Sequence, residues 1–331
     1  MTTPRALPPE SLTSGLAFHR LVFARRRTGW WTPLVVGALG TAFYFAMVTL
    51  IAVGVGVATL WDPTLADAVL RFDAGEAFDL TDPGRLLVAL GTIALMLPAY
   101  LLASRIVNGR RLGLVSSAAG RLRWRWMLLC TVIAAIIAVA LSTLSLLLPA
   151  EEGAGDGVVD PAANPMLWAS LAVILVAVPL QAAAEEYVFR GYLQQAVGRW
   201  LRHPAFAILL PVPLFVIGHL YDPLGQVTVG LFAIATGWLT WRTGGLEAAI
   251  ALHVVNNLTA FLLGLSGQSD INETAPSWFS IVFSVVIVVA FAGAVEWLLR
   301  RRPLPRTLVL TPPTSVPAYD AGARLSASRI V

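Results

Sequence analysis

Residues 166–186 read MLWASLAVILVAVPLQAAAEE, an apolar run that carries no charge before its last two residues. As an α-helix this run extends about 31 Å, which matches the roughly 30 Å hydrocarbon core of a bilayer. Inside a bilayer each backbone N–H and C=O has to be paired within the segment, so we expect a helix. The sequence therefore predicts a membrane-spanning helix that ends in two neighbouring carboxylates, Glu185 and Glu186.

The rest of the chain repeats this apolar pattern. Only 13% of its 331 residues are charged, about half of the roughly 25% that is usual in a soluble domain. Eight apolar segments approach or exceed the length that crosses a bilayer, so we expect an all-α, polytopic membrane protein of about eight transmembrane helices. The segments are 33–60, 85–104, 127–149, 166–186, 204–220, 225–241, 245–265 and 279–299.

The charges between the predicted spans alternate in sign along the chain. Arginines precede the first span at 20–27, fill the loop 105–126 and end the last span at 300–302, whereas the loops 61–84 and 150–165 are acidic. Arginine-rich loops stay on the cytoplasmic side of a membrane. The pattern therefore predicts a multi-pass protein of the cytoplasmic (inner) membrane with both termini in the cytoplasm.

The chain divides into four parts. Residues 1–32 form a cytoplasmic N-terminal segment without the apolar stretch of a cleavable signal peptide, and residues 33–149 hold the first three transmembrane helices and their loops. Residues 150–302 hold the remaining helices. The tail 303–331 is rich in Pro, Ser, Thr and Ala, and we expect it to be a disordered cytoplasmic segment.

Composition also restricts the classes of partner and of site. All 23 basic residues are arginines and the net charge is +4. Their position in loops favours contact with an anionic membrane surface over nucleic acid binding. The single cysteine, Cys130, excludes an intrachain disulfide and a cysteine-based structural zinc site.

Charged side chains inside a span are costly and usually functional. Glu186 and Arg190 are one helical turn apart, so they are predicted to form an ion pair. Glu185 projects about 100° away around the helix and stays available. The simpler alternative is that both glutamates extend to the cytoplasmic interface.

Two histidines also lie in predicted spans. His219 sits in the segment 204–220, and His253 shares a helical face with Asn257. Taken alone, each histidine is better explained as a hydrogen-bonded residue of the core. The neighbouring Asn256 is expected to mediate contact between helices.

Considered together, these polar groups suggest a reaction. A carboxylate, two imidazoles and an amide in one cavity are sufficient for hydrolysis by an activated water. The carboxylate would remove a proton from the water. One imidazole would orient that water, and the other, with the amide, would stabilise the oxyanion of a tetrahedral intermediate.

At these positions the sequence resembles the CPBP intramembrane protease family, which includes the type II CAAX prenyl endopeptidases and the bacterial Abi proteins. Three ordered motifs carry the resemblance: Glu-Glu-x-x-x-Arg at 185–190, Phe-x-x-x-His at 215–219 and His-x-x-x-Asn at 253–257. The resemblance implies that 150–302 form a catalytic helix core with an intramembrane catalytic cavity. It implies a CAAX-protease-like intramembrane endopeptidase, a class often termed metalloendopeptidases.

The resemblance also implies a role for each motif residue. Glu185 would be the general base and His219 would help to activate the water, while His253 and Asn257 would stabilise the oxyanion. Three residues would support these four, namely Glu186 and Arg190 as an ion pair and Phe215 packed beside the site.

The residues leave the need for a metal open. Glu185, His219 and His253 could form a zinc site with an open position. We favour the reaction without a cofactor, because a His-Glu-x-x-His motif is absent and a glutamate with two hydrogen-bond donors can act without a metal.

The depth of the motifs conflicts with straight helices. Counted along their spans, His219 would lie roughly 22 Å from the cytoplasmic face and His253 only about 12 Å from it. We therefore expect prolines to interrupt the segment 204–220, or the fourth helix to continue through 187–200. The site should open toward the cytoplasm.

Two other functions fit the same residues. Glu and His inside a bundle can relay protons in a proton-coupled transporter, although the two related halves that many transporters show are not evident. A non-catalytic membrane scaffold or immunity protein of the same fold is the other alternative. The expected partners are the lipid bilayer and a peptide or membrane-associated protein that enters from the cytoplasm.

Overall fold

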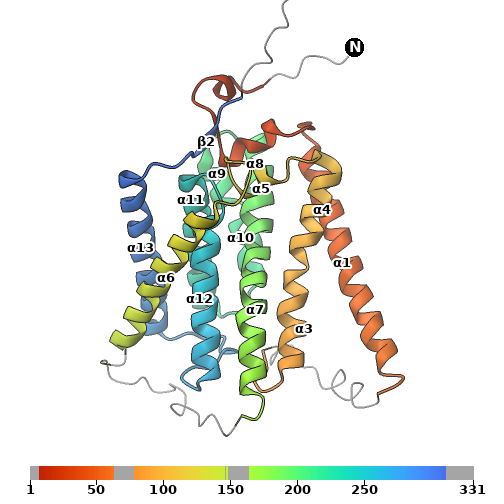
Figure 1. The fold of residues 1–331 in the computed structure, drawn as a ribbon, viewed down its shortest axis with the longest axis vertical. Helices are drawn as coiled ribbons and strands as arrows, with labels where there is room; N and C mark the ends of the chain where they lie inside the picture. Colours follow the sequence, from red (N-terminus) through yellow and green to blue (C-terminus); the bar gives the residue numbers. More distant parts are fainter. Residues whose placement is uncertain (1–6, 63–77, 146, 148–163, 311–331) are drawn as a thin grey trace, which may run out of the picture.

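The protein is an elongated bundle of helices (Figure 1). The computed structural model describes residues 7–62, 78–145, 147 and 164–310. Among these residues the sheet consists of two short strands, so the predicted all-α membrane fold is confirmed. The elements in chain order are η1 (Pro9–Leu12), β1 (Leu16–Ala17), η2 (Phe18–Ala24), α1 (Thr32–Ala58), α3 (Pro83–Ala94), α4 (Met96–Asn108), α5 (Gly113–Ser116), α6 (Trp124–Ser145), α7 (Leu167–Glu186), η5 (Tyr187–Leu193), α8 (Gln194–Trp200), α9 (Pro204–Leu209), α10 (Val212–Ile217), α11 (Pro223–Thr243), α12 (Glu247–Leu265), α13 (Trp278–Arg301) and β2 (Thr307–Leu308).

Seven helices in the described part of the chain are long and apolar enough to cross a membrane. They correspond to seven of the eight predicted segments, with α3 and α4 acting as one span. The short break between α3 and α4 has a local cause. Pro98 has no N–H to bond the carbonyl of Ala94, so α3 ends at that residue.

The eighth predicted segment, 204–220, is not one straight helix. It forms α9 and α10, which are interrupted at Pro211 because a proline in the second helix cannot continue the hydrogen bonds of the first. After α10 the chain contacts the connection between α12 and α13, where the Asp222 N–H donates to the Thr274 carbonyl at 2.8 Å. The segment thus crosses the bundle as two short helices, as the prolines predicted.

Both described ends of the chain lie at the same end of the bundle. β1 pairs antiparallel with β2, and Leu16 lies opposite Leu308. Figure 1 shows β2 above the helices, at the end of the bundle where α8 and α9 lie. The arrangement agrees with an even number of crossings, seven long helices and one broken one.

The structure differs from the expectation of a disordered tail over 303–310. Residues 307–308 form β2, and the Leu310 N–H donates to the Ser11 carbonyl at 2.8 Å. Composition alone did not reveal this order, because the partner strand lies at the other end of the chain. Residues 311–331 lie outside the described residues.

α12 forms the centre of the bundle. In the most apolar stretch of α12, 50% of the residues are buried, whereas in α1, at the edge of the bundle, only 11% are buried. Small residues of α12, Ala248 and Ala251, pack against Cys130 and Ala134 of α6 and against Phe291 of α13. Small side chains let helices approach closely, and this central position sets the motif of α12 against that of α7.

Candidate active site

The helix that carries Glu185 and Glu186 is longer than a single span. α7 continues through η5 and α8, so one helical segment extends over Leu167–Trp200. Glu185 lies about 22 Å from the end at Trp200, near the middle of the segment. The expected continuation through 187–200 is confirmed, and it places Glu185 at about the depth that was counted for His219. η5 is a π-helical stretch directly after Glu186, a distortion that is frequent at functional sites.

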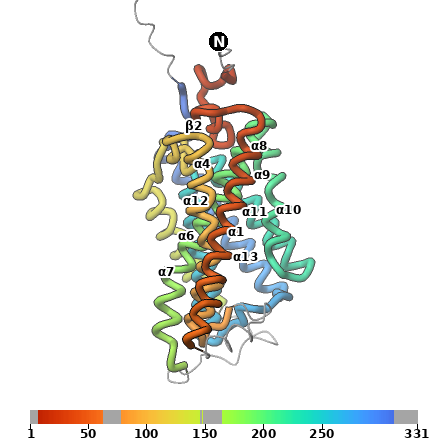
Figure 2. The backbone as a smooth tube through the Cα atoms, turned by 90° about the vertical axis from the view of Figure 1, so that its right-hand side faces the viewer, coloured from red at the N-terminus to blue at the C-terminus, as the bar shows by residue number. Residues whose placement is uncertain are grey.

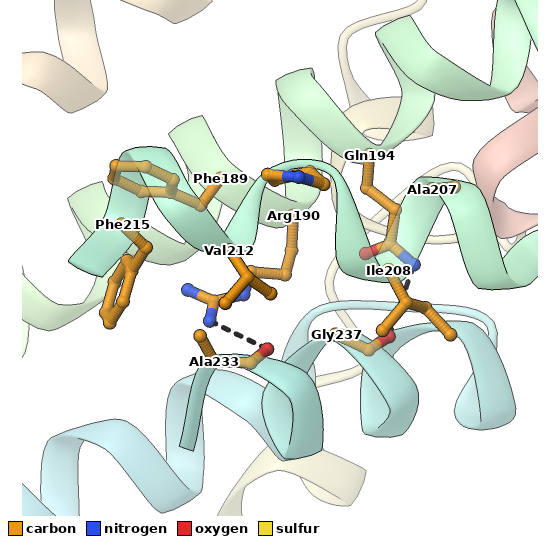
Figure 3. Close-up of a pocket in the computed structure, with 10 residues that line it drawn as sticks. Phe189, Arg190, Gln194, Ala207, Ile208, Val212, Phe215, Ala233 and Gly237 are labelled. Atoms are coloured by element: carbon orange, nitrogen blue, oxygen red, sulfur yellow. Dashed lines mark hydrogen bonds between the residues drawn. The ribbon is translucent and has the colours of Figure 1, made fainter. Parts of the chain in front are cut away.

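Glu186 is the hub of a buried network. Its side chain is fully buried, and Oε1 accepts from Arg190 Nη1 at 3.0 Å and contacts His253 Nδ1 at 2.8 Å. The predicted ion pair is therefore present. Arg190 also donates from Nη2 to the carbonyl of Ala233 at 3.1 Å, as Figure 3 shows. The pair joins the helices α11 and α12 to the helix of the two glutamates.

Of the two carboxylate oxygens of Glu185, one accepts a hydrogen bond and the other has no hydrogen-bond partner among the described residues. Oε1 accepts from Gln181 Nε2 at 2.7 Å. Oε2 faces His253 Nε2 at 3.5 Å and is buried, with no hydrogen-bond partner among the described residues. Glu186 Oε2 and Glu296 Oε2 are also buried without a partner in the described part of the chain, but Glu185 Oε2 is the one of the three that faces His253 Nε2. This oxygen is placed where it could bind a water.

His253 lies between the two glutamates. One ring nitrogen faces Glu186 and the other faces Glu185. Glu186 and Arg190 compensate each other in charge, so one proton held between Glu185 and His253 would leave the whole cluster neutral. The pair can therefore take up a proton from one group and return it to another.

Gln181 is a site residue that the sequence analysis missed. It lies one turn before Glu185, and its Oε1 accepts from Asn257 Nδ2 at 3.1 Å. It thus links Asn257 to Glu185, which do not need to touch directly. The spacing from Gln181 to Glu185 along one helix was the available signal. Asn256 joins the chain by donating to Asn257 Oδ1 at 3.2 Å.

His219 is attached to the network through an aromatic ring. Its Nδ1 lies 2.8 Å from the carbonyl oxygen of Phe215, and the two ring centroids are 4.6 Å apart. Phe215 also lies 6.2 Å from the His253 ring and 4.5 Å from the Arg190 guanidinium carbon. Phe215 therefore packs beside the site, between His219 and His253. His253, not His219, is the histidine that faces Glu185.

The hollow beside Arg190 in Figure 3 is small, with a volume of about 10 Å³. Such a space holds roughly one water. Phe189, Val212 and Phe215 form part of its wall. A catalytic cavity that admits a peptide stays a prediction.

The residues present do not fit a metal site in this arrangement. Among the described residues no group of three or more His, Cys, Asp or Glu side chains is placed to hold a metal ion. Of the three proposed ligands, Glu185 and His253 are together, whereas Phe215 stands between His253 and His219.

Two other ion-paired carboxylates, Glu247 and Glu296, lie at helix ends outside the network. Glu247 is fully buried at the start of α12, and Arg123 donates to its Oε2 at 2.6 Å. Glu296 accepts from Arg242 at 2.9 Å and from Arg300 at 3.1 Å. These pairs join helix ends, and neither carboxylate has a histidine beside it among the contacts of the described residues.

Known proteins resemble the part of the chain that carries this network. Residues 167–259, which contain all three motifs, match the family model described as type II CAAX prenyl endopeptidase Rce1-like. The uncharacterized protein YyaK of Bacillus subtilis (strain 168) is 26% identical over 245 residues, and the match covers 69% of this chain and 80% of that protein. No solved structure matches the chain significantly.

Proposed function

We propose that the protein is an intramembrane endopeptidase that hydrolyses a peptide bond with a water activated by Glu185. The match of residues 167–259 to the family model described as type II CAAX prenyl endopeptidase Rce1-like supports this proposal. One observation carries the proposal. Glu185 Oε2 is buried, unpartnered and 3.5 Å from a ring nitrogen of His253. A water bound there would contact a proton acceptor and a second group that can hold the proton.

The reaction starts when Glu185 removes a proton from the water. The resulting hydroxide attacks the carbonyl carbon, a C–O bond forms, and the π electrons move to the carbonyl oxygen. Collapse of the tetrahedral intermediate breaks the C–N bond. The proton held between Glu185 and His253 then passes to the leaving nitrogen, so one water yields one new carboxyl group and one new amine. General acid–base catalysis of this kind contributes roughly 10²–10⁴-fold to a rate.

The tautomer of His219 supports a role in orienting the water. A carbonyl oxygen only accepts, so the contact with Phe215 fixes the proton of His219 on Nδ1. In a neutral imidazole with this tautomer, Nε2 has a lone pair that can accept a hydrogen bond from the water. For this role the segment 218–222 has to bring His219 toward Glu185 when substrate binds.

Asn257 and His253 are the proposed donors to the oxyanion. Asn257 Nδ2 carries two hydrogens and uses one of them on Gln181. The second hydrogen is available to a substrate oxygen. His253 supplies the other hydrogen bond from Nε2 when it holds the shared proton. Donors that are fixed before the reaction stabilise an oxyanion at little cost of reorganisation.

The expected substrate is a peptide or a membrane-associated protein segment. The positive-inside rule supports entry from the cytoplasm, because the arginine-rich loop 105–126 and both described chain ends share one face of the bundle. A prenylated C-terminal peptide is the first substrate to test, since the family is described by that activity.

The test is cleavage by the purified full chain. The protein in detergent is incubated with farnesylated and unmodified peptides, and mass spectrometry identifies the new termini. We expect fragments from the wild type and at least a roughly 100-fold lower rate for Glu185→Ala and for His219→Ala. Glu273→Gln is the matched control, since Glu273 is an exposed carboxylate on the connection between α12 and α13, and it should cleave normally.

Two outcomes would contradict the proposal. Cleavage that survives both substitutions would remove the assigned mechanism. Proton-driven uptake of a solute into liposomes, without any cleavage by the wild type, would instead identify a transporter.

A further inference from the structure

A hollow of about 560 Å³ lies at the start of α1, far from the glutamate network along the chain. Its volume is in the range of ligand sites, roughly 300–1,000 Å³. Residues 23–32 form most of its wall, and Arg199 near the end of α8 completes it. Figure 2 shows that the start of α1 lies beside α8 at this end of the bundle.

The hollow is strongly basic. Arg26, Arg27 and Arg199 line it. Residues 11–61, which include most of the wall, contain no Asp or Glu, and neither do residues 187–221 around Arg199. Among the described residues, no acidic partner faces the exposed Arg26 and Arg27 side chains. The three positive charges are therefore directed to a partner outside the protein.

The three arginines are not equivalent. Arg199 is held in place, because Nε donates to the Thr28 carbonyl at 2.6 Å and its guanidinium carbon lies 4.9 Å from the centre of the Phe23 ring. Among the described residues, no hydrogen bond from the terminal nitrogens of Arg199 is seen, so they can donate to an anion. Arg26 and Arg27 are exposed at the rim. One fixed cation and two adjustable ones can enclose a phosphate group, which arginine binds through pairs of N–H groups.

The location identifies the source of the phosphate. The hollow borders Thr32, the first residue of a helix apolar enough to cross a membrane. Trp31 forms part of the wall, and Trp30 beside it is 64% exposed. Exposed tryptophans at the end of a span lie at the level of lipid headgroups. The N-terminus of α1 adds a partial positive charge at the same place.

We propose that this hollow binds the phosphate of an anionic phospholipid through Arg26, Arg27 and Arg199. The bound lipid links the segment 23–32 to α8. Because α8 continues the helix of Glu185, the lipid stabilises the end of the helix that carries the proposed catalytic base. The proposal does not depend on peptidase activity, so the lipid-binding test is independent of the cleavage test.

The test measures lipid binding to the full chain. Protein stripped of lipid is placed in nanodiscs of phosphatidylcholine with increasing phosphatidylglycerol, and native mass spectrometry counts the retained lipids. Each arginine near an anionic surface contributes roughly a fivefold factor to binding. We therefore expect the double variant R26Q/R27Q to bind phosphatidylglycerol about thirtyfold more weakly than the wild type.

The control variant is R301Q/R302Q. It removes the same two charges at the end of α13, where Arg301 lies over the Trp297 ring and both arginines are exposed. We expect its affinity to fall clearly less than that of R26Q/R27Q, because Arg301 and Arg302 do not line the hollow. Phosphatidylglycerol should also raise the unfolding temperature of the wild type and of the control but not of R26Q/R27Q, since a ligand stabilises the folded state that it binds.

Three results would overturn the proposal. Equal losses in the two double variants would indicate general attraction to a charged surface. Unchanged binding in R26Q/R27Q would place the lipid elsewhere. Binding of inorganic phosphate by the wild type in pure phosphatidylcholine, without any preference for phosphatidylglycerol, would identify a site for a free anion.

Discussion

Neutralising Glu186 should destabilise the protein far more than neutralising a carboxylate at the edge of the bundle. Glu186 is fully buried and accepts hydrogen bonds from Arg190 at 3.0 Å and from His253 at 2.8 Å. The Arg190 side chain is 4% exposed. Glu186→Gln would leave this guanidinium buried without its counter-charge, and removing one partner of a buried pair costs about 3–5 kcal/mol.

The assay is unfolding in mixed micelles, with the fraction unfolded measured by tryptophan fluorescence as SDS is added. Glu296→Gln is the comparison, because Glu296 forms ion pairs with Arg242 and Arg300 but its side chain is 24% exposed. Partly exposed pairs contribute less than buried ones, so this variant should unfold closer to the wild type than Glu186→Gln does.

A second variant separates loss of charge balance from loss of packing. The double substitution Glu186→Gln with Arg190→Met removes both charges, and replacement of a whole buried pair is often close to neutral. We expect it to recover most of the stability that Glu186→Gln loses, which a double-mutant cycle detects. The reasoning would be refuted if Glu186→Gln cost no more than Glu296→Gln, or if the double variant were no more stable than the single one.

The remaining predictions concern Gln181 and the N-terminal segment. Gln181→Leu should lower peptidase turnover roughly 10- to 100-fold with little change in KM, because loss of a hydrogen bond to a carboxylate costs roughly 1.5–3 kcal/mol. Steady-state kinetics measure this, and an unchanged turnover would contradict it. Gly198→Ala should release residues 16–24 to hydrogen exchange, since the added methyl would collide with the backbone carbonyl of His19; protection equal to the wild type would refute this. Burial lowers the pKa of His19 from 6.5, and its Nε2 donates to the Arg202 carbonyl. As the pH falls, His19 therefore takes up a proton in the detached segment at a higher pH than in the attached one. The attachment of residues 16–24 should be fully stable above about pH 6.5 and should weaken as the pH falls through the lowered pKa of His19. Hydrogen exchange between pH 7.5 and 5 measures this stability, and His19→Gln should abolish its pH dependence.

The sequence was sufficient to predict the helices because lipid imposes a simple rule on length and polarity. It also predicted the interruption of 204–220, since a proline in a helix has a local and general effect. The ion pair of Glu186 and Arg190 followed from helical spacing. Each of these features depends on residues close together in the chain.

The arrangement between helices could not be obtained in this way. Helical spacing placed His253 and Asn257 on one face, but it did not show that His253 would lie between Glu185 and Glu186. That position depends on the packing of α12 against α7. Gln181 was missed for a related reason, because a single amide in an apolar helix is usually a contact between helices and its two partners come from different elements.

The most direct test of the proposed function compares Glu185→Gln with the wild type in both activity and stability. The substitution keeps the size of the side chain and the hydrogen bond at one oxygen, but it removes the proton acceptor that faces His253. We expect the rate of peptide cleavage by purified protein to fall roughly 10²–10⁴-fold, while the unfolding midpoint in SDS stays close to that of the wild type. Cleavage at the wild-type rate by a folded Glu185→Gln protein would contradict the assignment of Glu185 as the base.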